Sequence, residues 1–88
     1  MYKIKNTNSK GDSFLLAGEY SQKKQAWLQA LIEAAEEAQD ILDCLETEED
    51  KKTLRIHPQG KQVVIICDKY LDGERYESIY SVENLSLN

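Results

Sequence analysis

Residues 21–46 read SQKKQAWLQALIEAAEEAQDILDCLE, and this segment sets the architecture of the chain. Apolar residues recur in it at steps of three and four, the spacing of one face of an α-helix. The main row comprises Trp27, Leu31, Ala34, Ala38, Ile41 and Leu45. The segment contains neither Gly nor Pro and is rich in strong helix formers. We therefore predict one long amphipathic helix that follows an N-cap at Ser21 and ends near Glu46.

The segments on either side of this helix have the patterns of β-strands. We predict strands over residues 2–5 and 13–20 before the helix, and over 54–56, 63–70 and 75–82 after it. Turn-forming residues separate them at 6–12, at 57–60 with Pro58 in the second position, and at 72–73. The sequence thus predicts an α+β fold in the order β-β-α-β-β-β, with the helix packed on a small antiparallel sheet.

The strand register follows from the turns. A two-residue loop at 72–73 pairs Cys67 with Ser78, and an even-numbered loop near 59–60 pairs Ile56 with Val63. The face that results is apolar and consists of Leu54, Ile56, Val63, Ile65, Cys67, Tyr80 and Val82. The opposite face carries Val64, Ile66 and Ile79, which are either ordinary surface or a secondary contact patch.

Length and composition narrow the class of protein. The chain has 88 residues, which suits a single domain spanning 1–88, and 41% of them are hydrophobic, too many for a disordered chain. The longest apolar run, 63–67, is far shorter than a membrane span. The start of the chain lacks the apolar core of a secretion signal, and two cysteines are too few for a disulfide framework. We expect a cytoplasmic protein with reduced thiols.

The predicted helix is long for a chain of this size. Its 26 residues would span about 39 Å, while a compact chain of this length has a radius of gyration of roughly 12 Å. The apolar row nevertheless continues to Ile41, Leu42 and Leu45. Either loops of the same chain cover that end or another chain does, so a self-associating structural domain, a homodimer, stays open as an alternative.

The net charge of −5 is unevenly distributed. Residues 33–50 contain nine carboxylates and no basic side chain, whereas the rest of the chain carries eleven basic and seven acidic side chains. Like charges three or four residues apart destabilise a helix, and negative charge near its C-terminal end opposes the helix dipole. The run is either a solvated face, partly neutralised by Lys51, Lys52 or Arg55, or a docking surface.

As a docking surface, the acidic face of the helix fits a protein partner with a basic surface. Its protein-binding residues would be Glu33, Glu36, Glu37, Asp40 and Asp43. The negative balance argues against direct binding of nucleic acid. In size, acidity and a single helix on a small sheet, the chain resembles the small acidic inhibitors that phages encode against host defence proteins, the anti-CRISPR and anti-restriction proteins. That resemblance implies stoichiometric inhibition of a nucleic-acid-binding complex, with carboxylates taking the place of phosphates.

Residues with the chemistry of catalysis are few. His57 is the single histidine, and neither Cys44 nor Cys67 has the surroundings of a nucleophile in the sequence. The acidic segment 46–50 lacks the ligand spacing of a calcium loop, and the four glycines are scattered. We expect no enzymatic activity, no catalytic residue, no metal and no cofactor. Base stacking on Tyr70, Tyr76 and Tyr80 is a minor alternative.

Overall fold

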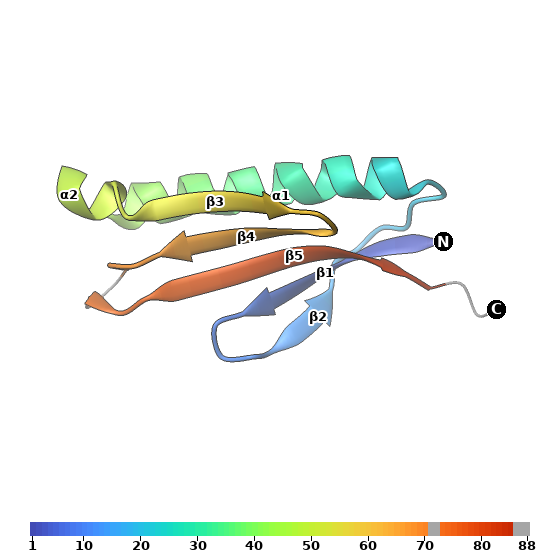
Figure 1. The fold of residues 1–88 in the computed structure, drawn as a ribbon, viewed down its shortest axis with the longest axis horizontal. Coiled ribbons are helices and arrows are strands. Elements are labelled where there is room, and N and C mark those ends of the chain that lie inside the picture. Colours follow the sequence, from blue (N-terminus) through green and yellow to red (C-terminus); the bar gives the residue numbers. More distant parts are fainter. Residues whose placement is uncertain (71–72, 86–88) are drawn as a thin grey trace.

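A computed structural model describes residues 1–70 and 73–85 and shows one long helix on a five-stranded antiparallel sheet (Figure 1). The elements are β1 (Tyr2–Asn8), β2 (Ser13–Leu15), α1 (Lys23–Cys44), α2 (Glu48–Lys51), β3 (Leu54–Gln59), β4 (Gln62–Cys67) and β5 (Tyr76–Asn84). The predicted α+β class and strand–helix order are confirmed. The single turn α2 is an addition that the sequence did not predict, and the Thr47 hydroxyl caps it by accepting from the Asp50 amide at 3.1 Å.

The sheet has the strand order β2-β1-β5-β4-β3, and each neighbouring pair is antiparallel. The first and last strands lie side by side, in a register that runs from Tyr2 opposite Asn84 to Asn8 opposite Ser78. This pairing puts β5 at the centre of the sheet, directly under α1. The two edges are the short β2 and the strand β3.

The molecule is elongated, because the helix and all the strands run along one axis (Figure 1). Its extents are 48 × 22 × 21 Å and its radius of gyration is 14.0 Å. A helix of 22 residues spans about 33 Å, so the body is long enough to lie under all of it. Ile41 and Leu45, near the helix end, share a buried cluster with Cys67, and Tyr70 and Tyr76 pack against it. The chain itself therefore covers this end of the apolar row.

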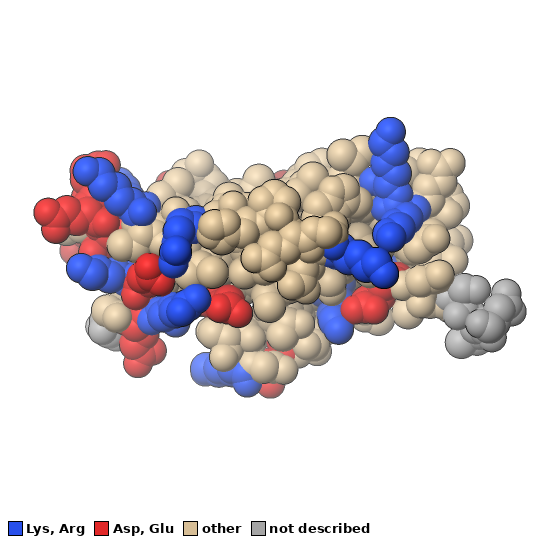
Figure 2. Space-filling model, viewed as in Figure 1, with Lys and Arg blue, Asp and Glu red and all other residues tan. Residues whose placement is uncertain are grey.

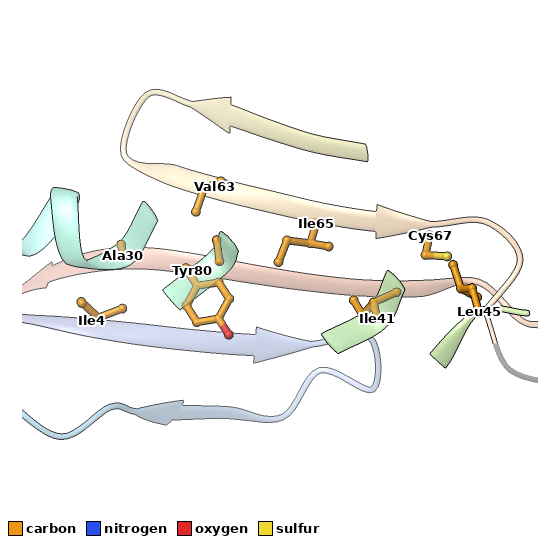
Figure 3. Close-up of a cluster of buried hydrophobic side chains, with 9 residues drawn as sticks. Ile4, Ala30, Ile41, Leu45, Val63, Ile65, Cys67 and Tyr80 are labelled. Atoms are coloured by element: carbon orange, nitrogen blue, oxygen red, sulfur yellow. The ribbon is translucent and has the colours of Figure 1, made fainter. Parts of the chain in front are cut away.

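Figure 3 shows how the core is made from both layers. Ile4 of β1, Val63 and Ile65 of β4 and Tyr80 of β5 point from the sheet toward the buried face of α1. On the helix, the residues nearest the sheet are alanines at every fourth position: Ala26, Ala30, Ala34 and Ala38. Their small side chains let the helix lie close to the sheet, while larger residues such as Trp27 and Leu31 are half-buried at the sides.

The predicted strand register is wrong by two residues in both hairpins. Ile65 pairs with Ser78 rather than Tyr80, and Ile56 pairs with Ile65 rather than Val63. The connection between β4 and β5 spans 68–75 instead of a two-residue loop, and Asp72 of the predicted turn lies outside the described residues. A shift of two preserves which face a side chain occupies, so the predicted apolar face is confirmed.

Pro58 lies in β3 and not in a turn. The chain turns instead at Gly60 and Lys61, between the paired residues Gln59 and Gln62, and Gly60 supplies the positive φ of +64°. A proline lacks the amide proton that an inner strand needs. β3 tolerates it because β3 is an edge strand with a neighbour on one side.

The other corrections concern element ends. Residues 6–8 continue β1 because the Asn6 amide is buried and donates to the Ser78 hydroxyl at 2.8 Å. The second strand stops at Leu15, and after Gly18, at φ +103°, Tyr20 makes a single bridge to Tyr2. That bridge keeps the chain extended, so α1 begins only at Lys23. The N-cap is Gln22, which makes no side-chain capping hydrogen bond, and the predicted N-cap at Ser21 is wrong.

Alanine substitutions of the cross-strand pair Ile65 and Ile56 test which of the two residues belongs to the core. Ile65 is completely buried, whereas 43% of Ile56 is exposed on the same face of the sheet. We expect Ile65→Ala to lower the free energy of unfolding by about 2–4 kcal/mol through lost burial and a cavity. Ile56→Ala should cost less than about 1 kcal/mol. Urea denaturation measures both, and equal losses would contradict this placement of the core.

Candidate protein-binding surface

The five carboxylates predicted to form one face of α1 do not share one face. Glu36, Asp40 and Asp43 are exposed, Glu33 is partly buried, and Glu37 points toward β5 beneath the helix. We therefore define the acidic surface as Glu36, Asp40 and Asp43, with Glu33 at its border. Glu37 is not part of this surface, because its carboxylate binds side chains of β5.

Glu37 accepts hydrogen bonds from three hydroxyl groups of the central strand. Ser78 donates at 2.9 Å and Tyr80 at 2.5 Å, and Tyr76 donates to the other carboxylate oxygen. The Ser78 hydroxyl in turn accepts from the Asn6 amide of β1 at 2.8 Å. These bonds join α1 to β5 and β1 across the core. The described side chains contain no buried polar atom without a partner, so the cluster is fully satisfied.

The sequence contained a signal for this cluster. Glu37 lies three residues after Ala34 and four before Ile41, both in the buried row, so helical spacing puts it on the edge of that row. The facing strand presents Tyr76, Ser78 and Tyr80 at alternate positions. Three hydroxyls on a core-facing strand require an acceptor. The sequence prediction placed Glu37 with the exposed carboxylates because it considered their charge and not the direction in which each side chain points around the helix.

The environment of the cluster raises the pKa of both tyrosines. For Tyr76 and Tyr80, burial is the main cause, followed by the hydrogen bond to Glu37 and by the charge of Glu37. Burial also raises the pKa of Tyr70, with a further contribution from the nearby Cys44. The phenols of Tyr76 and Tyr80 therefore stay protonated, and stay donors, well into the alkaline range.

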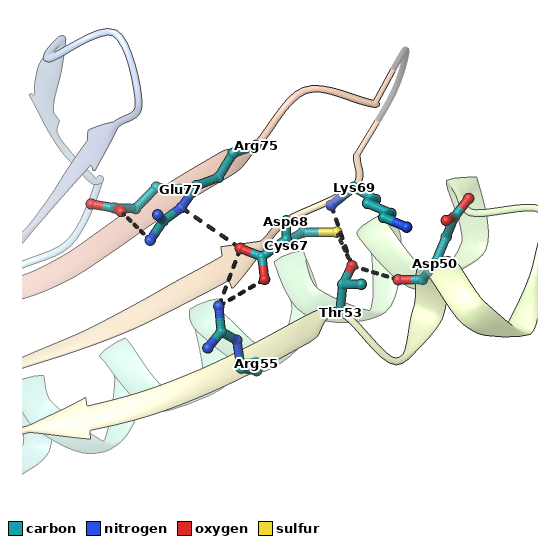
Figure 4. Close-up of polar contacts among 8 residues, drawn as sticks. All are labelled: Asp50, Thr53, Arg55, Cys67, Asp68, Lys69, Arg75 and Glu77. Carbon is teal, nitrogen blue, oxygen red and sulfur yellow. Dashed lines mark hydrogen bonds and ion pairs between the residues drawn. The ribbon is translucent and has the colours of Figure 1, made fainter.

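Of the three cations expected to neutralise the acidic run, Lys51 and Arg55 pair with acids outside the acidic surface, and no ion pair of Lys52 is found within the described residues. Arg55 pairs with Asp68 at 3.0 Å, and Arg75 bridges Asp68 and Glu77, on the sheet face opposite the helix (Figure 4). Lys51 pairs with its own neighbour Glu48 at 3.6 Å. Within residues 1–70 and 73–85, no ion pair involves a carboxylate of the acidic surface. Among the described residues, its side-chain hydrogen bonds are those that the Gln29 amide donates to Glu33 and the Gln39 amide donates to Asp43, each at 3.0 Å.

The predicted secondary patch of Val64, Ile66 and Ile79 lies on the face of the sheet away from α1, as the register predicts. Val64 pairs with Ile79 across β4 and β5. Figure 2 shows this side of the molecule, with an uncharged middle and charged side chains gathered toward both ends. Val64 is 6% exposed, however, and the other two are half-buried. The apolar surface that the patch offers is therefore small.

The sheet separates the residues considered for catalysis. His57 is exposed on the face away from the helix, where it is the cross-strand partner of Val64. Cys67 is buried on the helix side, with its sulfur 3.6 Å from the Thr53 hydroxyl (Figure 4), and Cys44 ends α1. The imidazole and the two thiols therefore do not form a Cys–His pair.

The tyrosines do not form an open stacking platform. Tyr80 is buried in the core. The chain leaves the strand after Cys67, and the Tyr70 ring packs on Tyr76 with centroids 4.9 Å apart. No group of three or more metal-ligating side chains comes together in the described residues. The acidic segment after α1 forms the capped turn α2 instead.

Comparisons with known proteins give no information on function. No family model, no curated protein and no solved structure matches this chain. In the part of the chain that the structure describes, no helix is both long enough and apolar enough to cross a membrane.

Neighbouring glutamates provide a matched test of the cluster. We expect Glu37→Ala to lower the free energy of unfolding by about 2–3 kcal/mol, because it leaves buried hydroxyls without their charged acceptor. Glu36→Ala removes the same side chain from an exposed position and should change stability by less than about 0.5 kcal/mol. Urea denaturation at neutral pH compares them. Similar values for the two variants would show that Glu37 does not hold the helix to the sheet.

The raised pKa values of Tyr76 and Tyr80 make stability depend on alkaline pH. In the unfolded chain a tyrosine ionises near pH 10, whereas the folded chain keeps these two protonated. The unfolded state thus loses protons first, and the free energy of unfolding falls as the pH rises above about 10. Tyr76→Phe/Tyr80→Phe should reduce that slope in urea titrations at several pH values. An unchanged slope would contradict the assignment.

Proposed function

We propose that this protein is a non-enzymatic binding protein that acts by stoichiometric contact of the acidic surface of α1 with a basic protein surface. The observation that supports the proposal is that, within the described residues, no ion pair involves these carboxylates, while Arg55 and Arg75 pair with acids on the opposite face of the sheet. Unpaired like charges on one helix destabilise the fold by a few tenths of a kcal/mol each. A partner that pairs with them relieves that repulsion on binding.

The spacing of the charges favours a partner that binds nucleic acid. Glu33, Glu36, Asp40 and Asp43 extend over about 15 Å of helix, or roughly one negative charge per 4–5 Å. Each strand of double-stranded DNA carries one per about 3.4 Å of helix axis. A groove lined with Lys and Arg for a phosphate backbone would therefore attract this helix face. The concrete form of the proposal is an inhibitor that occupies such a groove, as the phage-encoded inhibitors of defence complexes do.

Charge reversal tests the proposed surface. We expect Glu36→Lys/Asp40→Lys/Asp43→Lys to lose at least about tenfold in affinity for the partner, because attraction becomes repulsion. The wild-type and variant chains would be immobilised and compared for the proteins they retain from a lysate of their own cells. Retention by the wild-type chain should weaken as salt is raised. Circular dichroism shows whether the variant keeps its fold.

A matched variant separates the surface from net charge alone. Asp12, Glu49 and Glu74 are exposed carboxylates outside α1, and their replacement by Lys changes the net charge by the same amount. This control should retain the partner. Equal retention by the helix variant and the wild-type chain, or equal loss in both triple variants, would refute the proposal. A retained protein would then be purified and tested for one-to-one binding and for displacement of its nucleic acid.

A further inference from the structure

A second apolar row runs along the side of α1 that faces away from the sheet. Leu28 and Ile32 are 51% and 49% exposed, Ala35 is exposed, and Leu42 is half-buried. With Gln25 and Gln39 these residues follow one another in alternating steps of three and four over the whole helix. That is the spacing of the a and d positions of a coiled coil. We call Leu28, Ile32, Ala35 and Leu42 the outer row.

The outer row is not needed for the core of a single chain. The alanines and Ile41 on the other side of α1 pack against the sheet, and the Glu37 cluster fixes which side that is. Single exposed aliphatic residues are common on protein surfaces. Four apolar residues at coiled-coil spacing form a row that suits contact with another helix.

We propose that the occupant of the outer row is α1 of a second copy of this chain, packed antiparallel. The charges of α1 support this choice. Lys23 and Lys24 begin the helix, and the acidic residues from Glu36 onward lie in its second half. An antiparallel pair brings the lysine end of each helix beside the acidic end of the other. A parallel pair would place acidic residues against their own equivalents.

Shape agrees with this arrangement. With the two-fold axis between positions 32 and 35, Ile32 of each copy lies opposite Ala35 of the other, so a large side chain meets a small one. Gln39 lies opposite Leu28 and interrupts the apolar row toward each end of the contact. The two sheets then form the outer layers and the two helices the inner ones. Asp40 and Glu33 stay at the rim of the contact.

The contact is small, so the dimer is expected to be weak. A standard interface buries about 800 Å² per partner, more than one face of a single helix offers. Dissociation constants in the range of about 10–100 μM suit such a contact. The chain would thus dissociate on dilution, and its dimerisation goes beyond the proposed function because it needs no other protein.

Analytical ultracentrifugation of the full chain over a range of concentrations tests the dimer. We expect the wild-type chain to shift from monomer to dimer as its concentration rises, and Leu28→Lys/Ile32→Lys to stay monomeric. The control is Phe14→Lys/Leu15→Lys on the edge strand β2, where two large apolar residues are equally exposed, at 53% and 47%. This variant should dimerise like the wild-type chain. Circular dichroism confirms that each variant is folded.

A spin label on Cys44 tests the direction of packing. Cys44 is exposed while Cys67 is buried, so the thiol of Cys44 takes the label. In the antiparallel pair the two labels lie roughly 30–40 Å apart, because each is about 10 residues from the axis. A parallel pair brings them within roughly 20 Å. Lys24→Glu should weaken the dimer roughly two- to fivefold, because it reverses charge in the basic end that lies beside the acidic end of the partner helix.

Three results would overturn the proposal. One is a wild-type chain that remains monomeric up to about 1 mM. Another is dimerisation by Leu28→Lys/Ile32→Lys equal to that of the wild-type chain. The third is a short distance between the Cys44 labels. None of them bears on capture of a basic partner by the acidic surface, so the failure of this inference and of the proposed function are distinguishable.

Discussion

The hydrogen bonds from three hydroxyls of β5 to the Glu37 carboxylate fix how α1 lies on the sheet. A helix with a row of alanines toward the sheet can roll with little loss of packing, because alanine side chains interlock weakly. A carboxylate that must meet Tyr76, Ser78 and Tyr80 allows one rotation. That rotation turns Glu36, Asp40 and Asp43 to solvent and sends the outer row of Leu28, Ile32, Ala35 and Leu42 away from the sheet. Both proposed interaction surfaces therefore follow from this buried polar cluster.

The charge of the molecule is divided between two faces with different roles. On the sheet face away from α1, acids and bases occur together and pair, as Arg55, Asp68 and Arg75 do. In the second half of α1, acids occur without bases, and no ion pair within the described residues involves them. Exposed pairs on the sheet contribute little to stability. The net negative charge of the molecule is therefore concentrated in residues 33–50.

Prediction from the sequence succeeded where the spacing of apolar residues is regular, and it failed where a turn or a single side chain decides the local structure. The period of α1 and the alternation of the strands predicted the fold class, the element order and the face of each core residue. The β4–β5 register was wrong by two because the 68–75 connection is longer than its Asp-Gly dipeptide suggests, and the β3–β4 register because the chain turns at 60–61 rather than 59–60. Pro58 was assigned to a turn because an edge strand is not recognisable before the sheet order is known. Glu37 was assigned to the exposed face because its partners are about forty residues away in the chain.

The sequence by itself determined that this chain is one amphipathic helix on an antiparallel sheet, with nine carboxylates and no base in residues 33–50. These properties are local, because hydrophobic periodicity, secondary-structure propensity and charge depend on residues that are close together in the sequence. The tertiary structure alone decided that β1 lies beside β5, that the end of α1 is covered by its own chain, and that one of the five helix carboxylates is turned inward. Those outcomes depend on contacts between residues far apart in the chain, and a local pattern does not contain them.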